Sequence, residues 1–203
     1  KKALGYSLTG SIREHSFFIL HGRGANGKTT LLNLILYILG DYAQRTPVET
    51  LLLKRTSSVP NDVARLKGAR FASAMESEQN RRLAESLVKA LTGGDVLIAR
   101  FLFGEFFEFD PEFKLFLGTN HKPVIRGTDH AIWRRIKLIP FEVIIPDEKQ
   151  DKDLINKLKA EASGILNWLL EGCLIWQEEG LDAPEEVKQA TLEYKTESDV
   201  IGQ

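Results

Sequence analysis

The feature that most constrains this sequence is a glycine-rich loop directly behind a short apolar run. Residues 16–20 read SFFIL, and residues 21–30 read HGRGANGKTT. The apolar run predicts a buried β-strand, and residues 31–39, LLNLILYIL, have helical periodicity and end at Gly40. Glycines permit backbone conformations that other residues avoid, so the sequence predicts a tightly curved loop between a strand and a helix.

The spacing inside this loop is that of a phosphate-binding loop. Gly22 is followed by four residues and then by Gly27, Lys28 and Thr29. Glycines let successive backbone N–H groups point at phosphate oxygens, and the helix N-terminus adds partial positive charge. Lys28 can reach the outer phosphates, and the Thr29 hydroxyl can bind Mg²⁺.

This loop predicts a nucleotide-binding site. We expect Lys28 to be a solvated charge in a preformed loop. The alternative, a glycine-rich turn that only caps a helix, is disfavoured. The expected nucleotide-binding residues are Gly22, Arg23, Gly24, Ala25, Asn26, Gly27, Lys28, Thr29 and Thr30.

Polar residues follow two further predicted strands. Residues 69–75 predict a buried strand that leads into Glu76, and residues 114–119 predict another that leads into Asn120. Hydrolysis of a bound nucleotide needs an acidic residue that holds the water shell of the metal and positions the attacking water. Glu76 is the first candidate and Glu78 the second, although glutamates after a strand can also belong to a solvated loop. Asn120 is the candidate for sensing the γ-phosphate.

Short apolar strands alternate with helices along the chain, which predicts an α/β fold with a largely parallel sheet covered on both faces. Two runs rich in β-forming residues, VLIARFLF and FFEF, flank Gly104 and Glu105 and predict a β-hairpin. The residues from Lys149 onward have a helical pattern. We expect strands at residues 16–21, 69–75, 114–119 and 135–141, and helices at residues 2–8, 30–39, 60–66 and 81–91.

Composition excludes several classes of protein. The 27 basic and 28 acidic residues leave a net charge of −1, so contact with a polyanion needs a local basic cluster. The single cysteine, Cys173, excludes a disulfide framework, and its apolar helical context predicts a buried side chain. No apolar run approaches the roughly 20 residues of a membrane span. We therefore expect a protein of a reducing, cytoplasmic compartment without a membrane partner.

Seven successive segments resemble the motifs of one family. They are LGYSLTG, GRGANGKTT, LGDYA, RLKGARFASAMESE, LVKALTGGD, ARFLFGEFFEFDPEFKLFLGTNHKP and IRGTDHAIWRRIKLIPF. Their order is similar to that of the superfamily 3 helicase domain of the phage and plasmid primase family, a type also found in poxvirus primase-helicases. The resemblance spans residues 3–142 and continues more weakly to residue 201. It implies an AAA+-type P-loop NTPase core that uses ATP and Mg²⁺, assembles as a homo-hexameric ring and moves along DNA at replication forks.

The resemblance also implies roles within one subunit. Lys28 and Thr29 match the phosphate-binding loop, Glu76 the Walker B position and Asn120 the sensor, with Thr29 and Glu76 as the metal-binding residues. Many relatives in the wider superfamily have two adjacent acids where this chain has Glu-Ser-Glu. The role of Glu78 therefore stays open.

Other residues are implied to act on the nucleotide of a neighbouring subunit. Lys89, in LVKALTGGD, falls in a motif with this role in related viral helicases. The doublet Arg134-Arg135 lies where this superfamily keeps its arginine finger. Arg135 is the better match because it begins a strand, and Arg134 is the alternative. We expect Ile132 and Trp133 to pack inward and to aim both arginines outward.

The resemblance places the β-hairpin in the central channel of the ring, in contact with single-stranded or fork DNA. Its composition is unusual for this role, because glutamates lie among its phenylalanines. Most of these phenylalanines could equally pack against the core. The candidate DNA-binding residues are Arg100, Phe103, Lys114 and Lys122.

We expect an ATPase core at residues 1–145 and a helical C-terminal subdomain at residues 146–203, together a fragment of a longer primase-helicase. The chain has neither the spacing of zinc ligands nor a primase active site, so a primase domain is expected elsewhere in the full-length chain. The expected function is an ATP-driven DNA helicase motor of a phage, plasmid or prophage replication protein. The alternative is a non-motor AAA+ switch that loads or remodels replication partners. The position of the hairpin before the sensor strand favours the motor.

Overall fold

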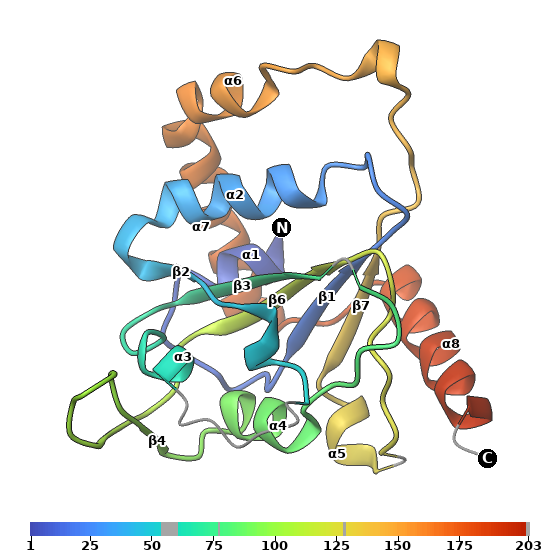
Figure 1. Cartoon of the computed structure of the whole chain (residues 1–203). Coiled ribbons are helices and arrows are strands. Elements are labelled where there is room, and N and C mark those ends of the chain that lie inside the picture. Colours follow the sequence, from blue (N-terminus) through green and yellow to red (C-terminus); the bar gives the residue numbers. More distant parts are fainter. Residues whose placement is uncertain (54–60, 77, 128, 202–203) are drawn as a thin grey trace.

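The computed structural model describes residues 1–53, 61–76, 78–127 and 129–201. Its centre is a five-stranded sheet in which every pairing is parallel, with the order β2-β3-β6-β1-β7 (Figure 1). The strands are β1 (Phe17–His21), β2 (Ala43–Arg45), β3 (Phe71–Glu76), β6 (Lys114–Thr119) and β7 (Ile136–Pro140). The predicted α/β fold with a parallel sheet is confirmed.

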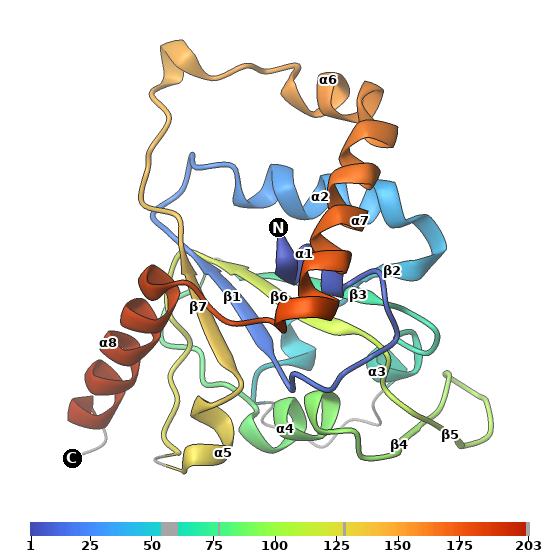
Figure 2. The ribbon, with the colours of Figure 1, turned by 180° about the vertical axis from the view of Figure 1, so that it is seen from behind.

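Helices cover both faces of this sheet (Figures 1 and 2). On one face lie α1 (Lys2–Tyr6), α2 (Lys28–Leu39) and α7 (Ala162–Glu179), and on the other lie α3 (Asn61–Ala64) and α4 (Glu85–Gly93). The remaining α-helices are α5 (His130–Trp133), α6 (Leu154–Ala160) and α8 (Glu185–Ile201), and 3-10 turns occur at Gly40–Tyr42, Val48–Thr50 and Asp147–Lys149.

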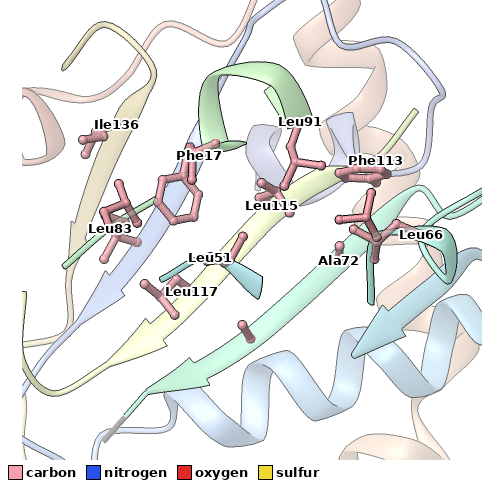
Figure 3. Close-up of a cluster of buried hydrophobic side chains, with 14 of the residues drawn as sticks. Phe17, Leu51, Leu66, Ala72, Leu83, Leu91, Phe113, Leu115, Leu117 and Ile136 are labelled. Atoms are coloured by element: carbon pink, nitrogen blue, oxygen red, sulfur yellow. The ribbon is translucent and has the colours of Figure 1, made fainter. Parts of the chain in front are cut away.

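The central strands send alternate side chains into two separate cores. Phe17 and Ile19 of β1 belong to the core under α3 and α4, whereas Phe18 and Leu20 belong to the core under α1, α2 and α7. Successive side chains of a strand point to opposite faces, so a strand with a helical layer on each side must be apolar throughout. Figure 3 shows the first of these cores, in which Leu115 of β6 lies between Phe17 of β1 and Ala72 of β3.

The register brings the carboxyl ends of three strands to the same level. Thr119 at the end of β6 is paired with His21 of β1 and with Glu76 of β3. Ligands of open parallel sheets bind outside these carboxyl ends. The loop after β1, Glu76 and Asn120 therefore emerge at one edge of the sheet.

Some elements differ from the sequence prediction. The strand β2 was not predicted, because a three-residue edge strand with two polar residues carries little apolar signal. The helix expected at residues 81–91 begins only at Glu85, because Arg82 and Leu83 form β-bridges to Val124 and Leu52. The predicted start of a helix at Pro60 lies outside the described residues.

The predicted β-hairpin is confirmed. The strands β4 (Leu97–Ala99) and β5 (Phe107–Phe109) pair antiparallel and form a sheet of their own. Phe109 is buried in the core, as the packing alternative proposed, whereas Phe101, Phe103 and Phe106 are exposed.

The C-terminal residues are helical, as predicted, and two of their helices pack on the rest of the chain. The helix α7 lies against α1 so closely that a Cβ atom on Gly5 would be 2.2 Å from the backbone nitrogen of Cys173. The helix α8 lies along β7, where the Leu138 N–H donates to the Thr191 hydroxyl at 3.0 Å. Cys173 is buried, as predicted. A boundary between two subdomains at residue 145 stays a prediction. Among the described residues, no helix is both long and apolar enough to cross a membrane.

Candidate nucleotide-binding site

The glycine-rich loop begins in a space that only glycine can occupy. The Gly22 N–H donates to the Thr119 carbonyl at 3.3 Å, which holds the start of the loop beside β6. A Cβ atom at Gly22 would lie 2.1 Å from the carbonyl oxygen of Phe141 and 2.4 Å from the side chain of Asn26. A side chain at position 22 would therefore displace the segment after β7 or the loop itself.

Positive φ angles curve the loop in front of α2. They occur at Gly24 (111°), Ala25 (47°) and Gly27 (83°). Glycine adopts such angles without strain, whereas alanine does not do so readily. Alternating right- and left-handed residues turn successive N–H groups toward one side, which forms a concave anion site at the helix N-terminus. The backbone of this loop thus fits a bound phosphate group.

Lys28 lies inside the loop. Its side chain is 3% exposed, and its ammonium donates to the Gly22 carbonyl at 2.8 Å and to Asn26 Oδ1 at 2.9 Å. The expectation of a solvated lysine is wrong, because these two acceptors hold the ammonium within the curve of the loop. Burial lowers the pKa of Lys28. An ammonium group has three donors, so one of them can still point at a phosphate oxygen.

A cavity of 410 Å³ opens between the loop and the ends of β3 and β6. Glu76 and Asn120 line it together with the loop residues from Gly24 to Thr30, and Met75 completes the lining. Of the residues predicted to bind the nucleotide, Gly22 and Arg23 lie outside this lining. The structure therefore brings together the glycine-rich loop, the Glu76 carboxylate and Asn120, which come from three separate parts of the sequence.

The two candidate acids have different surroundings. Glu76 is 6% exposed, lines the cavity, and accepts a hydrogen bond from the Glu78 N–H at 2.7 Å. The Glu78 carboxylate lies on the exposed side and pairs with Arg81 at 2.5 Å. Glu76 is thus placed for chemistry in the cavity, and the backbone of Glu78 orients the Glu76 carboxylate.

Thr29 and Glu76 are the residues that could hold Mg²⁺, because both line the same cavity. Within the described ranges, no group of three or more His, Cys, Asp or Glu side chains could hold a metal ion. This arrangement fits Mg²⁺, which proteins usually bind through one or two side chains together with phosphate oxygens and water.

Two residues that hold the loop carry no signal in the sequence. The Phe141 carbonyl accepts a hydrogen bond from Asn26 Nδ2 at 2.8 Å, and the Ile145 N–H donates to the Ala25 carbonyl at 2.8 Å. Both act through the main chain, so their side-chain types do not reveal the contact.

The arginine doublet divides between core and surface. Ile132 and Trp133 are buried, as predicted, and Arg134 is exposed. Arg135 is only 6% exposed, so the expectation that it points outward is wrong. Its guanidinium donates to the Thr92 hydroxyl at 3.1 Å and to the Ala131 carbonyl at 2.6 Å.

Burial lowers the pKa of Arg135. Its guanidinium lies at the C-terminal end of α4, where the helix dipole favours a positive charge. The geometry therefore favours Arg134 over Arg135 for any contact with another molecule.

Lys89 lies outside the cavity lining. Its ammonium pairs with Asp129 at 2.8 Å, and this hydrogen bond lowers the pKa of the Asp129 carboxyl. The pair joins α4 to the N-terminus of α5, where Asp129 also caps the helix by accepting from the Ile132 N–H at 2.9 Å.

The four candidate DNA-binding residues lie in different environments. Phe103 is 99% exposed at the tip of the hairpin, and the Arg100 guanidinium lies 4.9 Å from the centre of the Phe106 ring. Lys122 pairs with Glu197 at 2.6 Å. Lys114 is buried and donates to backbone carbonyls of Thr9 and Glu112, so its assignment to a DNA surface is wrong.

Comparison with known proteins shows similarity to a segment of several viral proteins. The chain is 34% identical over 98% of its length to a candidate helicase of Acanthamoeba polyphaga mimivirus, and 32% identical over 90% of its length to a candidate helicase of Frog virus 3. It is 29% identical over 66% of its length to a candidate primase of African swine fever virus. The chain is thus similar to viral proteins named as helicases and primases. It spans only 23%, 21% and 14% of their respective lengths. No protein-family model matches it.

The fold also occurs in a solved structure. The C-terminal region of NrS-1 in its apo form superposes with a TM-score of 0.69 over 96% of this chain and 47% of that structure, at 15% sequence identity. At this identity, the likeness supports the fold and carries no assignment of activity.

Proposed function

We propose that this chain is the ATP-hydrolysing motor of a viral or plasmid DNA helicase of superfamily 3, with an AAA+ core. One observation carries the proposal: a single cavity joins the phosphate-binding loop to Glu76 and Asn120. The similarity to viral proteins named as helicases supports the same function.

The cavity residues would divide the work on ATP as follows. The N–H groups of the loop and the Lys28 ammonium would bind the β- and γ-phosphates. Mg²⁺ held by Thr29 and Glu76 would offset the negative charge of the phosphates. The Glu76 carboxylate would orient the attacking water, and the Asn120 amide would donate to the γ-phosphate.

A second copy of the chain would complete the site. Among the described residues that line the cavity, none is an arginine. The exposed guanidinium of Arg134 is free to reach another molecule, and we propose that it acts as the arginine finger at an interface of a hexameric ring. Such arginines increase hydrolysis rates by about 10³- to 10⁵-fold. Lys89 is proposed to act at the same interface after its exposed pair with Asp129 opens.

We propose that the motor moves along single-stranded DNA. The tip of the hairpin presents the fully exposed ring of Phe103 and, further back, the Arg100 guanidinium. Proteins bind single strands without sequence preference through exposed aromatic rings, which stack on unpaired bases, and through cationic side chains, which contact the phosphates.

The test is the variant Lys28→Met, which keeps the length of the side chain and removes its charge. We expect ATP turnover to fall on the order of 100-fold or more, because the phosphates lose a positioned charge. The control is Lys152→Met, which removes an exposed lysine outside the cavity and should keep wild-type turnover. Circular dichroism of both variants checks folding. Near-normal turnover in a folded Lys28→Met variant would refute the proposal.

A non-motor AAA+ switch is the second candidate function. The observation that favours it is the hairpin, whose exposed Phe101, Phe103 and Phe106 lie beside Glu105 and Glu108, a surface suited to a protein partner. Stimulation of ATP turnover by single-stranded DNA separates the two functions. A motor should hydrolyse ATP several-fold faster with DNA, whereas a switch should not respond.

A further inference from the structure

A second cavity, of 290 Å³, lies between α5, the start of β7 and α8. Its lining includes one arginine and three lysines: Arg134 at the end of α5, Lys137 on β7, and Lys188 and Lys195 on α8. We call these four residues and the cavity between them the basic groove. None of the residues described as lining it is acidic. A groove with this one-sided charge attracts anions, although the chain as a whole has a net charge of −1.

The groove is separate from the nucleotide cavity. Ile136, at the amino end of β7, pairs with Phe17, at the amino end of β1, whereas the phosphate-binding loop follows the carboxyl end of β1. Figures 1 and 2 both show α5 and α8 beside β7, at the edge of the sheet. A nucleotide bound by the loop of the same chain therefore lies at the other end of the strands.

The helix α8 holds its two lysines in fixed positions. Lys188 and Lys195 are seven residues apart, which places them on the same face of the helix and about 10.5 Å apart along its axis. Thr191, between them, accepts a hydrogen bond from the backbone of Leu138 at 3.0 Å. The buried ring of Tyr194 packs edge-on against Trp133 of α5. These contacts fix α8 against β7 and α5.

The cations of the groove are weakly compensated. Lys188 pairs with Asp182 at 3.3 Å, but both side chains are more than half exposed, and such pairs contribute little. The Lys137 ammonium donates to the Arg134 carbonyl at 3.0 Å. In the part of the chain that the structure describes, no ion pair involves Arg134, Lys137 or Lys195.

The floor of the groove is apolar. Val187 and Ile136 are buried in it, and the side chain of Leu192 is exposed at its side. A basic rim above an apolar floor matches a strand that offers phosphates on one side and unpaired bases on the other. A fully hydrated inorganic anion would gain nothing from the apolar part.

We propose that the lysines of the basic groove bind the phosphate backbone of single-stranded nucleic acid, as a contact separate from the hairpin, while Arg134 beside them contacts the nucleotide of a neighbouring subunit. The choice of nucleic acid as the ligand rests on the proposed helicase function, whereas the position of the site rests on the groove itself. A strand held here would be anchored on α8 while the hairpin engages another part of it.

The test is the double variant Lys188→Gln/Lys195→Gln, measured by fluorescence anisotropy with a labelled oligothymidylate. Arg134 stays unaltered, because it is the proposed arginine finger. The matched control is Lys149→Gln/Lys152→Gln, which removes the same charge from two exposed lysines outside the groove. Circular dichroism confirms that both variants are folded.

Each phosphate contact on a single strand contributes about −0.7 to the slope of log K against log salt concentration. Removing two contacts should therefore reduce the magnitude of the slope by about 1.4 and weaken binding about 25-fold at 0.1 M salt. The control should keep both the slope and the affinity of the wild type.

Three outcomes would overturn the proposal. Equal affinities of the double variant and its control would show that the groove does not contact the strand, while the helicase function would stand. A loss of ATP turnover with unchanged oligonucleotide affinity would show that the groove serves a nucleotide of a neighbouring copy. If the wild type binds no oligonucleotide while it hydrolyses ATP, both the groove and DNA as the substrate are wrong, and the ATPase assignment stands.

Discussion

The burial of Arg135 and the exposure of Arg134 predict opposite effects for two alanine variants. Arg135→Ala removes the hydrogen bonds to Thr92 and to the Ala131 carbonyl. Hydrogen bonds to charged groups contribute about 1.5–3 kcal/mol each, so at the lower end of this range the loss of both should lower the free energy of unfolding by about 3 kcal/mol. Arg134→Ala alters an exposed side chain and should change this free energy by less than about 0.5 kcal/mol.

Thermal unfolding followed by circular dichroism measures this difference. For a domain of this size, about 3 kcal/mol corresponds to a decrease in Tm of about 6–12 °C. Arg134→Ala should keep the wild-type Tm but lose about 10³-fold or more in ATP turnover, because the finger is missing. At a temperature where it is folded, Arg135→Ala should keep most of its turnover.

Mixing variants tests whether the finger acts between subunits. Arg134→Ala lacks the finger and Lys28→Met lacks the phosphate contact, so each is inactive alone. A mixture forms some interfaces in which an intact loop faces an intact Arg134, and part of the turnover should return. The assignment of Arg134 as the finger and of Arg135 as a structural residue is refuted if Arg135→Ala keeps the wild-type Tm and loses ATP turnover while Arg134→Ala stays active. If ATP turnover does not recover although subunit exchange is confirmed, Arg134 acts within its own subunit.

Two further predictions concern buried charges. Glu76→Gln should still bind ATP but hydrolyse it at least 100-fold more slowly. Glu78→Gln should lose less of the hydrolysis rate, because of these two glutamates only Glu76 lines the cavity. Single-turnover hydrolysis measures both rates, and a larger loss in Glu78→Gln would contradict the assignment. Burial lowers the pKa of Lys114 from 10.5 to about 7 in the folded chain. Between these two pKa values Lys114 is protonated in the unfolded chain and neutral in the folded chain. The free energy of unfolding should therefore rise as the pH increases from about 7 to 10, and this contribution is lost as the pH falls. Urea unfolding should show this rise in the wild type and a flatter profile in Lys114→Met; parallel profiles would contradict it.

The sequence determined four of the five strands of the central sheet and most of the residues that line the nucleotide cavity. Apolar runs with helices between them predict parallel strands, and parallel strands bring their carboxyl ends to one edge. Polar residues directly after such runs, as at Glu76 and Asn120, must then lie near the loop that follows β1. No long-range information was needed, because each signal lies within about ten residues of the chain.

Only the tertiary structure decided which charged side chains are buried. Arg134 and Arg135 are neighbours with the same side chain, and their different exposure depends on α4, which receives one guanidinium at its end. Lys114 begins a strand that is covered on both faces, so its ammonium turns to backbone carbonyls. The basic groove likewise exists only because α8 packs along β7, which brings Lys188 and Lys195 beside a segment about 50 residues earlier. The burial of a charged side chain and the clustering of charges depend on contacts between segments that are distant in the sequence. Local sequence patterns do not predict those contacts.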